Sequence, residues 1–125
     1  MHPITVTVHV PDSVLADILT TAVEGGSSYW LAAERIERDA DLNVTRIVSA
    51  VDASTFHQFD ADINRHDITQ ATILAGLALL AEGALPGRND LRAQIAAMAS
   101  DSHDIDAGDA DAILQLGFFG KVVFG

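Results

Sequence analysis

One segment of the chain combines histidine and carboxylate side chains, which are ligands for zinc, manganese and iron. Its candidate ligands lie within ten residues, at His57, Asp60, Asp62 and His66. Their spacing is not that of an H-E-x-x-H site. It is not that of a calcium loop either, because Arg65 and Ala71 stand where such a loop needs Gly and Glu. We expect a solvated polar loop here and no metal, and we keep a small metal-dependent enzyme as an alternative.

Catalytic nucleophiles and phosphate-binding loops are poorly represented. The chain has no cysteine, which excludes thiol catalysis, thiolate metal sites and a disulfide framework. Ser27 and Ser28 follow Gly25 and Gly26 without the G-x-S-x-G pattern of a nucleophile turn. The two glycines also end a predicted helix, whereas anions bind at helix N-termini. We therefore expect no catalytic residue and no cofactor.

The first group of candidate binding residues surrounds an early turn and the chain end. It comprises Glu24, Gly25, Gly26, Tyr29, Trp30, Gln115 and Phe119. The chain contains one Tyr and one Trp, and these are adjacent. Adjacent residues on a strand point to opposite faces, so one ring should enter the core and the other should lie at a surface. Aromatic residues with a polar end are frequent anchors at interfaces and ligand pockets.

The second group of candidates lies in an acidic stretch. Five acids occur within eleven residues, at Asp101, Asp104, Asp106, Asp109 and Asp111. We expect Asp106 or Asp109 to cap the following helix, because anions are favourable near a helix N-terminus. Asp104 and Asp106 are also candidates for docking a basic partner.

Composition limits the classes of function. The 125 residues, 49% of them hydrophobic, are enough for one domain with a core. The net charge of −11, from 18 acidic and 7 basic residues, disfavours direct contact with nucleic acid and anionic membranes. No apolar run is long enough to span a membrane, and the first residues lack a signal-peptide pattern. We expect a cytoplasmic protein with no nucleic-acid or membrane binding, and a basic host protein as a candidate partner.

Alternation of apolar and β-branched residues predicts three strands. They cover residues 4–10, 44–51 and, at the chain end, 121–124. Residues 29–36 fit one strand face but also include good helix formers, and we favour the strand. A short further strand is expected at residues 56–59.

Apolar residues at helical spacing predict four helices, at residues 14–23, 71–80, 89–99 and 109–116. The expected N-caps of the first three are Asp12 or Ser13, Asp67 or Thr69, and Asn89. The second helix is apolar all round, so we expect burial on every side.

These elements predict a single α+β domain over residues 1–125, with a small, mostly antiparallel sheet and three to four helices on one face. We expect part of the burial of the second helix and of the Phe-rich chain end to come from another subunit. The chain should therefore form a homo-oligomer, and a dimer is favoured.

Two short motifs carry a resemblance. The first is E-G-G-x-x-Y-W at residues 24–30. The second is a helix that begins D-A-D-A at residue 109 and leads into Q-x-x-x-F-G-x-V-x-F-G at residues 115–125. In both, the chain resembles small uncharacterised proteins encoded by tailed phages and prophages. The resemblance implies a phage or prophage origin rather than an activity. Phe124 stands where Tyr is expected, which implies that a hydroxyl there is not essential.

These observations favour a non-enzymatic phage accessory protein. It would bind a host protein or a small ligand, for example to counter a host defence. The alternatives are a structural or regulatory phage component without a ligand, and the metal-dependent enzyme based on His57, Asp60, Asp62 and His66.

Overall fold

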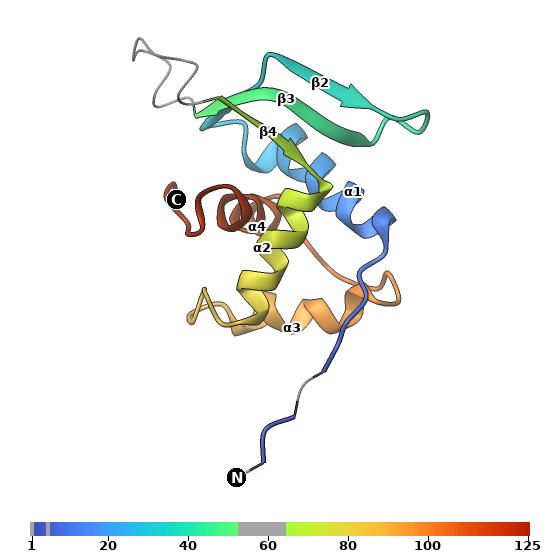
Figure 1. Cartoon of the computed structure of the whole chain (residues 1–125), viewed down its shortest axis with the longest axis vertical. Coiled ribbons are helices and arrows are strands. Elements are labelled where there is room, and N and C mark those ends of the chain that lie inside the picture. The colour runs from blue at the N-terminus through green and yellow to red at the C-terminus, as the bar shows by residue number, and fades with distance from the viewer. Residues whose placement is uncertain (1, 5, 53–64) are drawn as a thin grey trace.

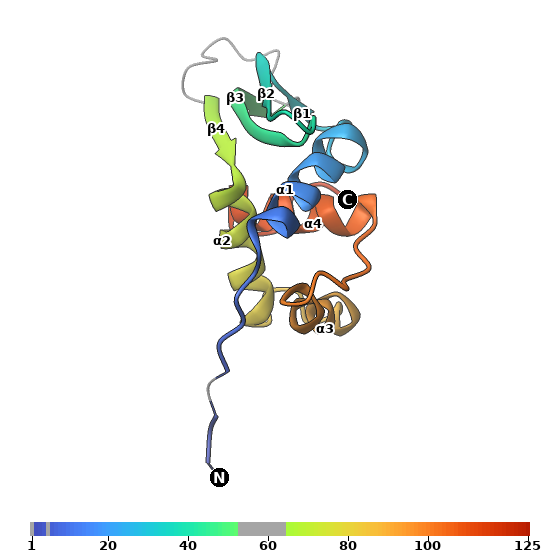
Figure 2. The same cartoon turned by 90° about the vertical axis from the view of Figure 1, so that its right-hand side faces the viewer.

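The computed structural model describes residues 2–4, 6–52 and 65–125 of the chain (Figure 1). In chain order these residues form α1 (Asp12–Thr21), the π-helical turn η1 (Ala22–Gly26), β1 (Leu31–Ala32), β2 (Arg35–Arg38), β3 (Val44–Asp52), β4 (Arg65–Thr69), α2 (Gln70–Ala81), α3 (Asn89–Met98) and α4 (Ala107–Phe119). The sheet lies at one end of the molecule, with the helices on one side of it and α3 farthest away (Figures 1 and 2). The predicted α+β fold is confirmed.

β3 is the central strand of the antiparallel sheet. β1 and β2 follow one another along one edge of β3 in a common register, from Leu31 opposite Asp52 to Glu37 opposite Arg46. β4 pairs along the other edge of β3. The strand predicted at residues 44–51 is therefore confirmed, and the one at 29–36 is confirmed in two short pieces. The strand predicted at residues 56–59 falls outside the described residues.

The strands predicted at residues 4–10 and 121–124 are wrong. The described residues 2–4 and 6–10, and all of 121–124, belong to no strand. Alternation describes only the two side-chain faces of a strand, and a strand also needs a neighbouring backbone for its N–H and C=O groups. No described strand lies beside either segment.

The four predicted helices are confirmed, with most boundaries shifted by one to three residues. The N-cap of α1 is Pro11, so neither Asp12 nor Ser13 caps it. Asp12 instead lies in the first turn, where its negative charge interacts favourably with the positive end of the helix dipole. The N-cap of α3 is Arg88 rather than Asn89.

The other two helix starts carry capping boxes. Thr69 caps α2, and its backbone N–H donates in return to the side chain of Thr72. Asp106 caps α4 by accepting a 2.7 Å hydrogen bond from the backbone N–H of Asp109. Such a cap stabilises a helix by about 1 kcal/mol, and it explains why α4 begins two residues before the predicted start.

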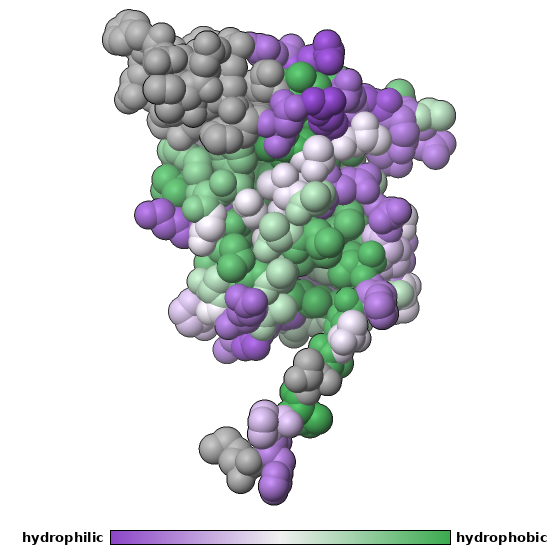
Figure 3. Space-filling model, in the orientation of Figure 1, coloured by the Kyte–Doolittle hydropathy of each residue, from purple (hydrophilic) through white to green (hydrophobic). Residues whose placement is uncertain are grey.

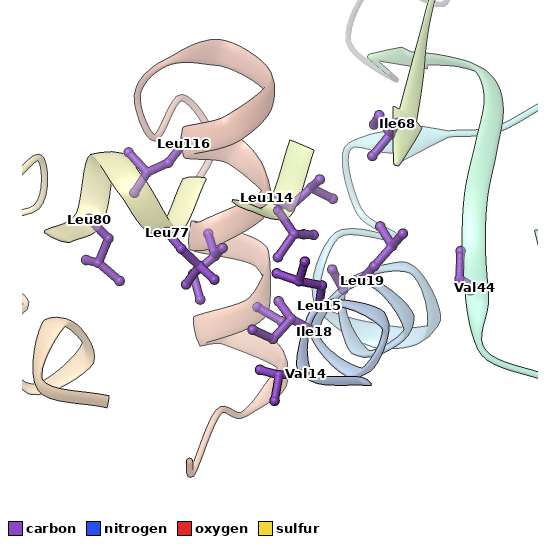
Figure 4. Packing of buried hydrophobic residues seen from close by; sticks show 14 of the residues in the cluster. Val14, Leu15, Ile18, Leu19, Val44, Ile68, Leu77, Leu80, Leu114 and Leu116 are labelled. Carbon is purple, nitrogen blue, oxygen red and sulfur yellow. The ribbon is translucent and has the colours of Figure 1, made fainter. Parts of the chain in front are cut away.

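The core lies between α1, α2, α4 and the inner face of the sheet. Figure 4 shows Val14, Leu15, Ile18 and Leu19 of α1 facing Leu114 of α4, with Val44 and Ile68 on the sheet side. Each fully buried aliphatic side chain of this kind contributes about 1.5–3 kcal/mol. The buried face of α1 is the one that its apolar spacing predicts.

Within the single chain, one face of α2 is buried and the other is exposed, so the predicted burial of the second face by another subunit stays a prediction. The core face of α2 consists of Ile73, Gly76, Leu77 and Leu80. The opposite face is exposed and consists of Ala71, Leu74, Ala75, Ala78 and Ala81. We call this second set the α2 stripe. A helix face that meets water usually carries polar residues, so the stripe is an apolar surface that the described residues leave exposed.

α2 and α4 approach so closely that only glycine fits at their contact. A Cβ atom on Gly117 would lie 1.9 Å from the carbonyl oxygen of Thr72, and one on Gly76 would lie 2.1 Å from that of Ile113. Both clashes are with backbone, so no side-chain rotation relieves them. Glycine costs about 1 kcal/mol relative to alanine in a helix interior, and close packing of the two helices offsets that cost.

We predict that Gly117→Ala destabilises the protein although alanine is the better helix former. The gain in helix propensity is about 1 kcal/mol, whereas overpacking against backbone costs about 3 kcal/mol or more. Urea unfolding followed by Trp30 fluorescence should show a net loss of about 2 kcal/mol. Gly87→Ala is the control, since a Cβ atom there meets nothing within 4 Å. Equal stability of Gly117→Ala and the unmodified protein would contradict this contact.

Candidate functional site

The carboxylate of Asp111, on α4, is the centre of a polar network although the residue is only 7% exposed. One of its oxygens accepts hydrogen bonds from Ser27 Oγ at 2.8 Å and from Trp30 Nε1 at 2.7 Å. The other accepts from Tyr29 Oη at 2.7 Å and from Gln115 Nε2 at 3.0 Å. These neutral donors replace the water that the carboxylate loses on burial. We call Asp111 and these four partners the Asp111 clasp.

The turn that supplies three of these donors is shaped by η1. The backbone N–H of Ser27 donates to the carbonyl of Ala22 at 2.7 Å, which closes a π-helical turn at the end of α1. Gly26 then contacts α4 so closely that a Cβ atom would lie 1.9 Å from the carbonyl oxygen of Ala107. Because the backbone touches α4 here, the side chains that follow reach Asp111 on its next turn.

Gln115 lies one helical turn after Asp111 and joins the chain end to it. Its Oε1 accepts hydrogen bonds from the backbone N–H groups of Val123 and Phe124, each at 2.8 Å. Its Nε2 donates to the carbonyl of Phe124 at 3.0 Å as well as to Asp111. The buried amide thus takes the place of a neighbouring strand. The backbone groups of Val123 and Phe124 are therefore paired without a strand beside them.

The ring of Trp30 is surrounded by phenylalanines from the chain end. It is 1% exposed, stacks on Phe124 at a centroid distance of 5.5 Å, and lies 5.2 Å from Phe119 and 5.9 Å from Phe118. Aromatic pairs contribute about 0.5–1.5 kcal/mol each beyond their buried area. The Phe-rich end therefore packs on its own chain, and its burial by another subunit stays a prediction.

Tyr29 and Trp30 differ in exposure as predicted, but both lie in the turn before β1 and not on a strand, so the predicted strand geometry is not the reason. Trp30 is buried, whereas Tyr29 is 56% exposed with only its hydroxyl held at Asp111. Partial burial and the Asp111 carboxylate raise the pKa of the Tyr29 phenol above its usual value of 10, and the hydrogen bond from Gln115 partly offsets this. The phenol therefore remains protonated, as its donor role requires.

Some of the other predicted binding residues lie beside the Asp111 clasp, whereas others lie apart from it. Glu24 is exposed and forms a 2.8 Å ion pair with Arg38 rather than contacting Tyr29. Gly25 and Gly26 face Ala107 at the start of α4. Asp106 caps α4, as described above. The structure therefore brings five predicted residues together, namely Gly26, Tyr29, Trp30, Gln115 and Phe119. Their role in binding stays a prediction.

Exposed acids gather between α1 and the α3–α4 connection. The side chain of His103 is 7% exposed, and its Nε2 lies 3.6 Å from a carboxylate oxygen of Asp17 and 3.6 Å from one of Asp101. Asp104 follows, with its backbone N–H held by Gln94 Oε1 at 2.8 Å. We call Asp17, Asp101, Asp104 and Asp106 the acidic rim. Acids from two parts of the chain therefore share one surface.

Metal binding receives no support from the part of the chain that the structure describes. There, no group of three or more His, Asp or Glu side chains is arranged to hold a metal ion. The alternative metal site is not tested, because His57, Asp60, Asp62 and the side chain of His66 lie outside the described set.

The sequence patterns did not predict that Asp111 and Ser27 belong to one site. A usable signal was present for Asp111. It stands four residues before Gln115 in a helix where Ala110, Ile113 and Leu114 are apolar, so the two polar residues share a face that the fold must bury. A buried acid needs donors, and the turn that holds the single Tyr and Trp carries them. For Ser27 we find no comparable signal.

Comparisons with known protein families, curated proteins and solved structures found no match for this chain. Among the described helices, none is long and apolar enough to cross a bilayer. Function can therefore be inferred only from the side chains of the two polar clusters. The Asp111 clasp pairs its own polar groups and ties the early turn, α4 and the chain end together, whereas the acidic rim faces solvent.

We predict that Asp111→Ala lowers the free energy of unfolding by about 2–5 kcal/mol. The change leaves the buried indole N–H of Trp30 and the buried hydroxyl of Ser27 without their acceptor, and each unsatisfied group costs about 1–3 kcal/mol. Urea unfolding followed by fluorescence measures the loss. Asp41→Ala, at an exposed turn, should change stability by less than about 0.5 kcal/mol. Similar losses in the two variants would show that the clasp does not stabilise the fold.

We predict that Tyr29 titrates above the ordinary tyrosine range and that Asp111→Asn lowers its pKa, because the neutral amide no longer opposes the phenolate. Near-ultraviolet absorbance reports this residue alone, since the chain has a single tyrosine. The native state keeps its proton while the unfolded chain loses it. Stability should therefore fall as pH rises above about 10, until the raised native pKa is passed. An unchanged tyrosine pKa in Asp111→Asn would contradict the contact.

Proposed function

We propose that this chain is a phage- or prophage-encoded accessory protein that binds a basic host protein and performs no catalysis. The acidic rim is the observation that carries the proposal, because its four residues are exposed, Asp17 and Asp101 lie together beside His103, and the net charge of the chain is −11. Charge complementarity of this kind accelerates association and selects basic partners. The protein would act in the cytoplasm of the bacterial host.

Hydrogen bonds hold the backbone beside the acidic rim in place, which favours binding of a partner. Asp106 caps α4, and Arg88 joins the starts of α3 and α4 through hydrogen bonds to Asp90 at 3.1 Å and to Asp109 at 2.6 Å. These contacts restrain the connection that carries Asp101 and Asp104. A preorganised surface loses less conformational entropy when a partner binds.

A protein partner fits the described residues better than a small ligand does. The polar atoms of Asp111 and Gln115 are paired within the chain, so a small polar molecule would have to break those bonds. An extended acidic surface can instead occupy a basic groove, including one that a host defence protein uses for nucleic acid. We include such a counter-defence role in the proposal.

We predict that Asp104→Asn/Asp106→Asn weakens capture of the host partner several-fold at low salt, and that the difference fades at high salt because exposed charges are screened. Asparagine is as good an N-cap as aspartate, so α4 should remain intact. Immobilised protein incubated with lysate of the bacterial host, followed by quantitative mass spectrometry, gives the measurement.

The matched control is Asp41→Asn/Glu82→Gln, which removes the same charge from exposed residues away from the rim. Loss of capture in the rim variant alone supports the proposal. Equal capture by all three proteins at every salt concentration, or equal loss in both variants, would overturn the assignment of the rim.

A further inference from the structure

The described residues before α1, 2–4 and 6–10, carry exposed apolar side chains and belong to no helix or strand. Ile4 is 89% exposed and Val6 is 78% exposed, and the segment projects away from the body in Figures 1 and 2. We call residues 2–10 the arm. Its alternation of Ile4, Val6, Val8 and Val10 is that of a strand with one apolar face, yet its described residues belong to no sheet.

The arm leads directly into an apolar groove beside the α2 stripe. The groove has a volume of about 200 Å³ and is lined by Val6, Val8 and Val10 of the arm, Leu74 and Ala78 of α2, and Ile95 of α3. Figure 3 shows the hydrophobic surface that covers the visible face of α2 and continues toward the arm. The groove and the stripe thus form one uncovered apolar surface, the kind that marks an interaction site.

The distribution of charge indicates what covers this surface. All 18 acidic residues of the chain follow residue 11, and neither residues 1–11 nor residues 68–81 contain a charged Asp, Glu, Lys or Arg side chain. A basic partner would gain no electrostatic attraction there. A second copy of the chain, which is repelled elsewhere by a net charge of −11, meets the least repulsion there.

We propose that two copies associate by pairing their arms as an antiparallel ribbon that lies over both α2 stripes. Pairing centred on Thr7 sets Ile4 of one copy opposite Val10 of the other and Val6 opposite Val8, so every apolar residue of the arm is matched on one face. Centring on Val8 would instead set Ile4 opposite Asp12, where α1 has already begun. A pairing of identical segments about a twofold axis closes after two copies.

The position of the groove agrees with this register. Val8 and Val10 are half-buried against their own chain, whereas Ile4 and Val6 are exposed. In the ribbon, Ile4 of one copy reaches the groove of the other because it lies opposite that copy's Val10. At about 3.3 Å per residue, the six-residue step from Ile4 to Val10 spans about 20 Å of extended chain. The ribbon also supplies partners for the backbone groups of the arm.

This dimer deepens the homo-oligomer expected from the sequence, but it depends on the arm and not on the acidic rim. Asp104→Asn/Asp106→Asn should therefore leave the dimer intact even if it abolishes capture of a host protein. Conversely, a failure of the dimer leaves the rim proposal standing.

Single cysteine variants test the ribbon and its register, because the chain has no cysteine of its own. Thr7→Cys places the two thiols directly opposite each other, at a Cα–Cα separation of about 4.5–5.5 Å that a disulfide accepts. Mild oxidation should therefore convert it to a covalent dimer. His9→Cys is the control on the same polar face, since its two copies would lie four residues apart, at about 13 Å. We expect its cross-linking to be at least about tenfold slower.

Sedimentation at micromolar concentration tests the association without cross-linking. The unmodified chain should be a dimer. Ile4→Asp and Leu74→Asp should each raise the dissociation constant at least tenfold, because each sets an unpaired carboxylate in the apolar contact. Leu42→Asp, at an exposed residue of a distant turn, should have no effect. Ile4 is almost fully exposed in the single chain, so loss of the dimer in Ile4→Asp cannot come from unfolding.

Three outcomes would overturn the proposal. An unmodified chain that sediments as a monomer would leave the groove to a partner of different sequence. A dimer in which Thr7→Cys and His9→Cys cross-link equally would show that the arms collide without a fixed register. A dimer insensitive to Ile4→Asp and Leu74→Asp would place the interface elsewhere.

Discussion

The burial of the Asp111 carboxylate is the constraint on which much of this structure depends. A buried carboxylate is costly unless donors replace its water, and here three of its four donors come from residues more than 80 positions away in sequence. To bring them within hydrogen-bond distance, α1 must end in a π-helical turn and Gly26 must touch the start of α4. Gln115 then extends the same network to the chain end. One desolvated charge thus couples the early turn, α4 and the last residues.

Close packing of α2 against α4 determines which residues of α2 remain exposed. Gly76 and Gly117 let α2 and α4 meet through their backbones, which fixes the core face of α2 and turns the α2 stripe toward solvent. The arm runs beside that stripe and lines the same groove. The molecule therefore has a core built from α1, α2, α4 and the sheet and, separately, an apolar surface that the described residues leave exposed.

Charge separates the two surfaces to which we assign binding. The acidic rim combines exposed carboxylates from α1 and the α3–α4 connection, and long-range attraction makes it suited to a basic partner. The arm and the α2 stripe lack charged side chains, so their association depends on burial of apolar area and on backbone pairing. Because the two surfaces use different physics, salt should separate their effects, and one copy can engage both partners.

Local pattern was sufficient to predict the helices, β3 and the α+β class, because apolar periodicity reports which face of an element is buried. It also predicted the contrasting exposure of Tyr29 and Trp30, although both lie in a turn and not on a strand. It failed for residues 4–10 and 121–124, since alternation describes one face of a strand and says nothing about a neighbouring backbone. For α2, composition predicted burial on every side but could not tell which side the rest of the chain reaches, and the described residues bury one face of it.

What the sequence by itself determined about this protein is therefore its elements, its charge and the residues able to donate or accept. Only the tertiary structure decided that Asp111 and Gln115 consume those donors and acceptors internally, and that Gln115 rather than a strand pairs the chain end. The reason is that hydrogen bonds and close contacts depend on distance in space. Segments more than 80 residues apart carry no local signal of the separation that folding gives them.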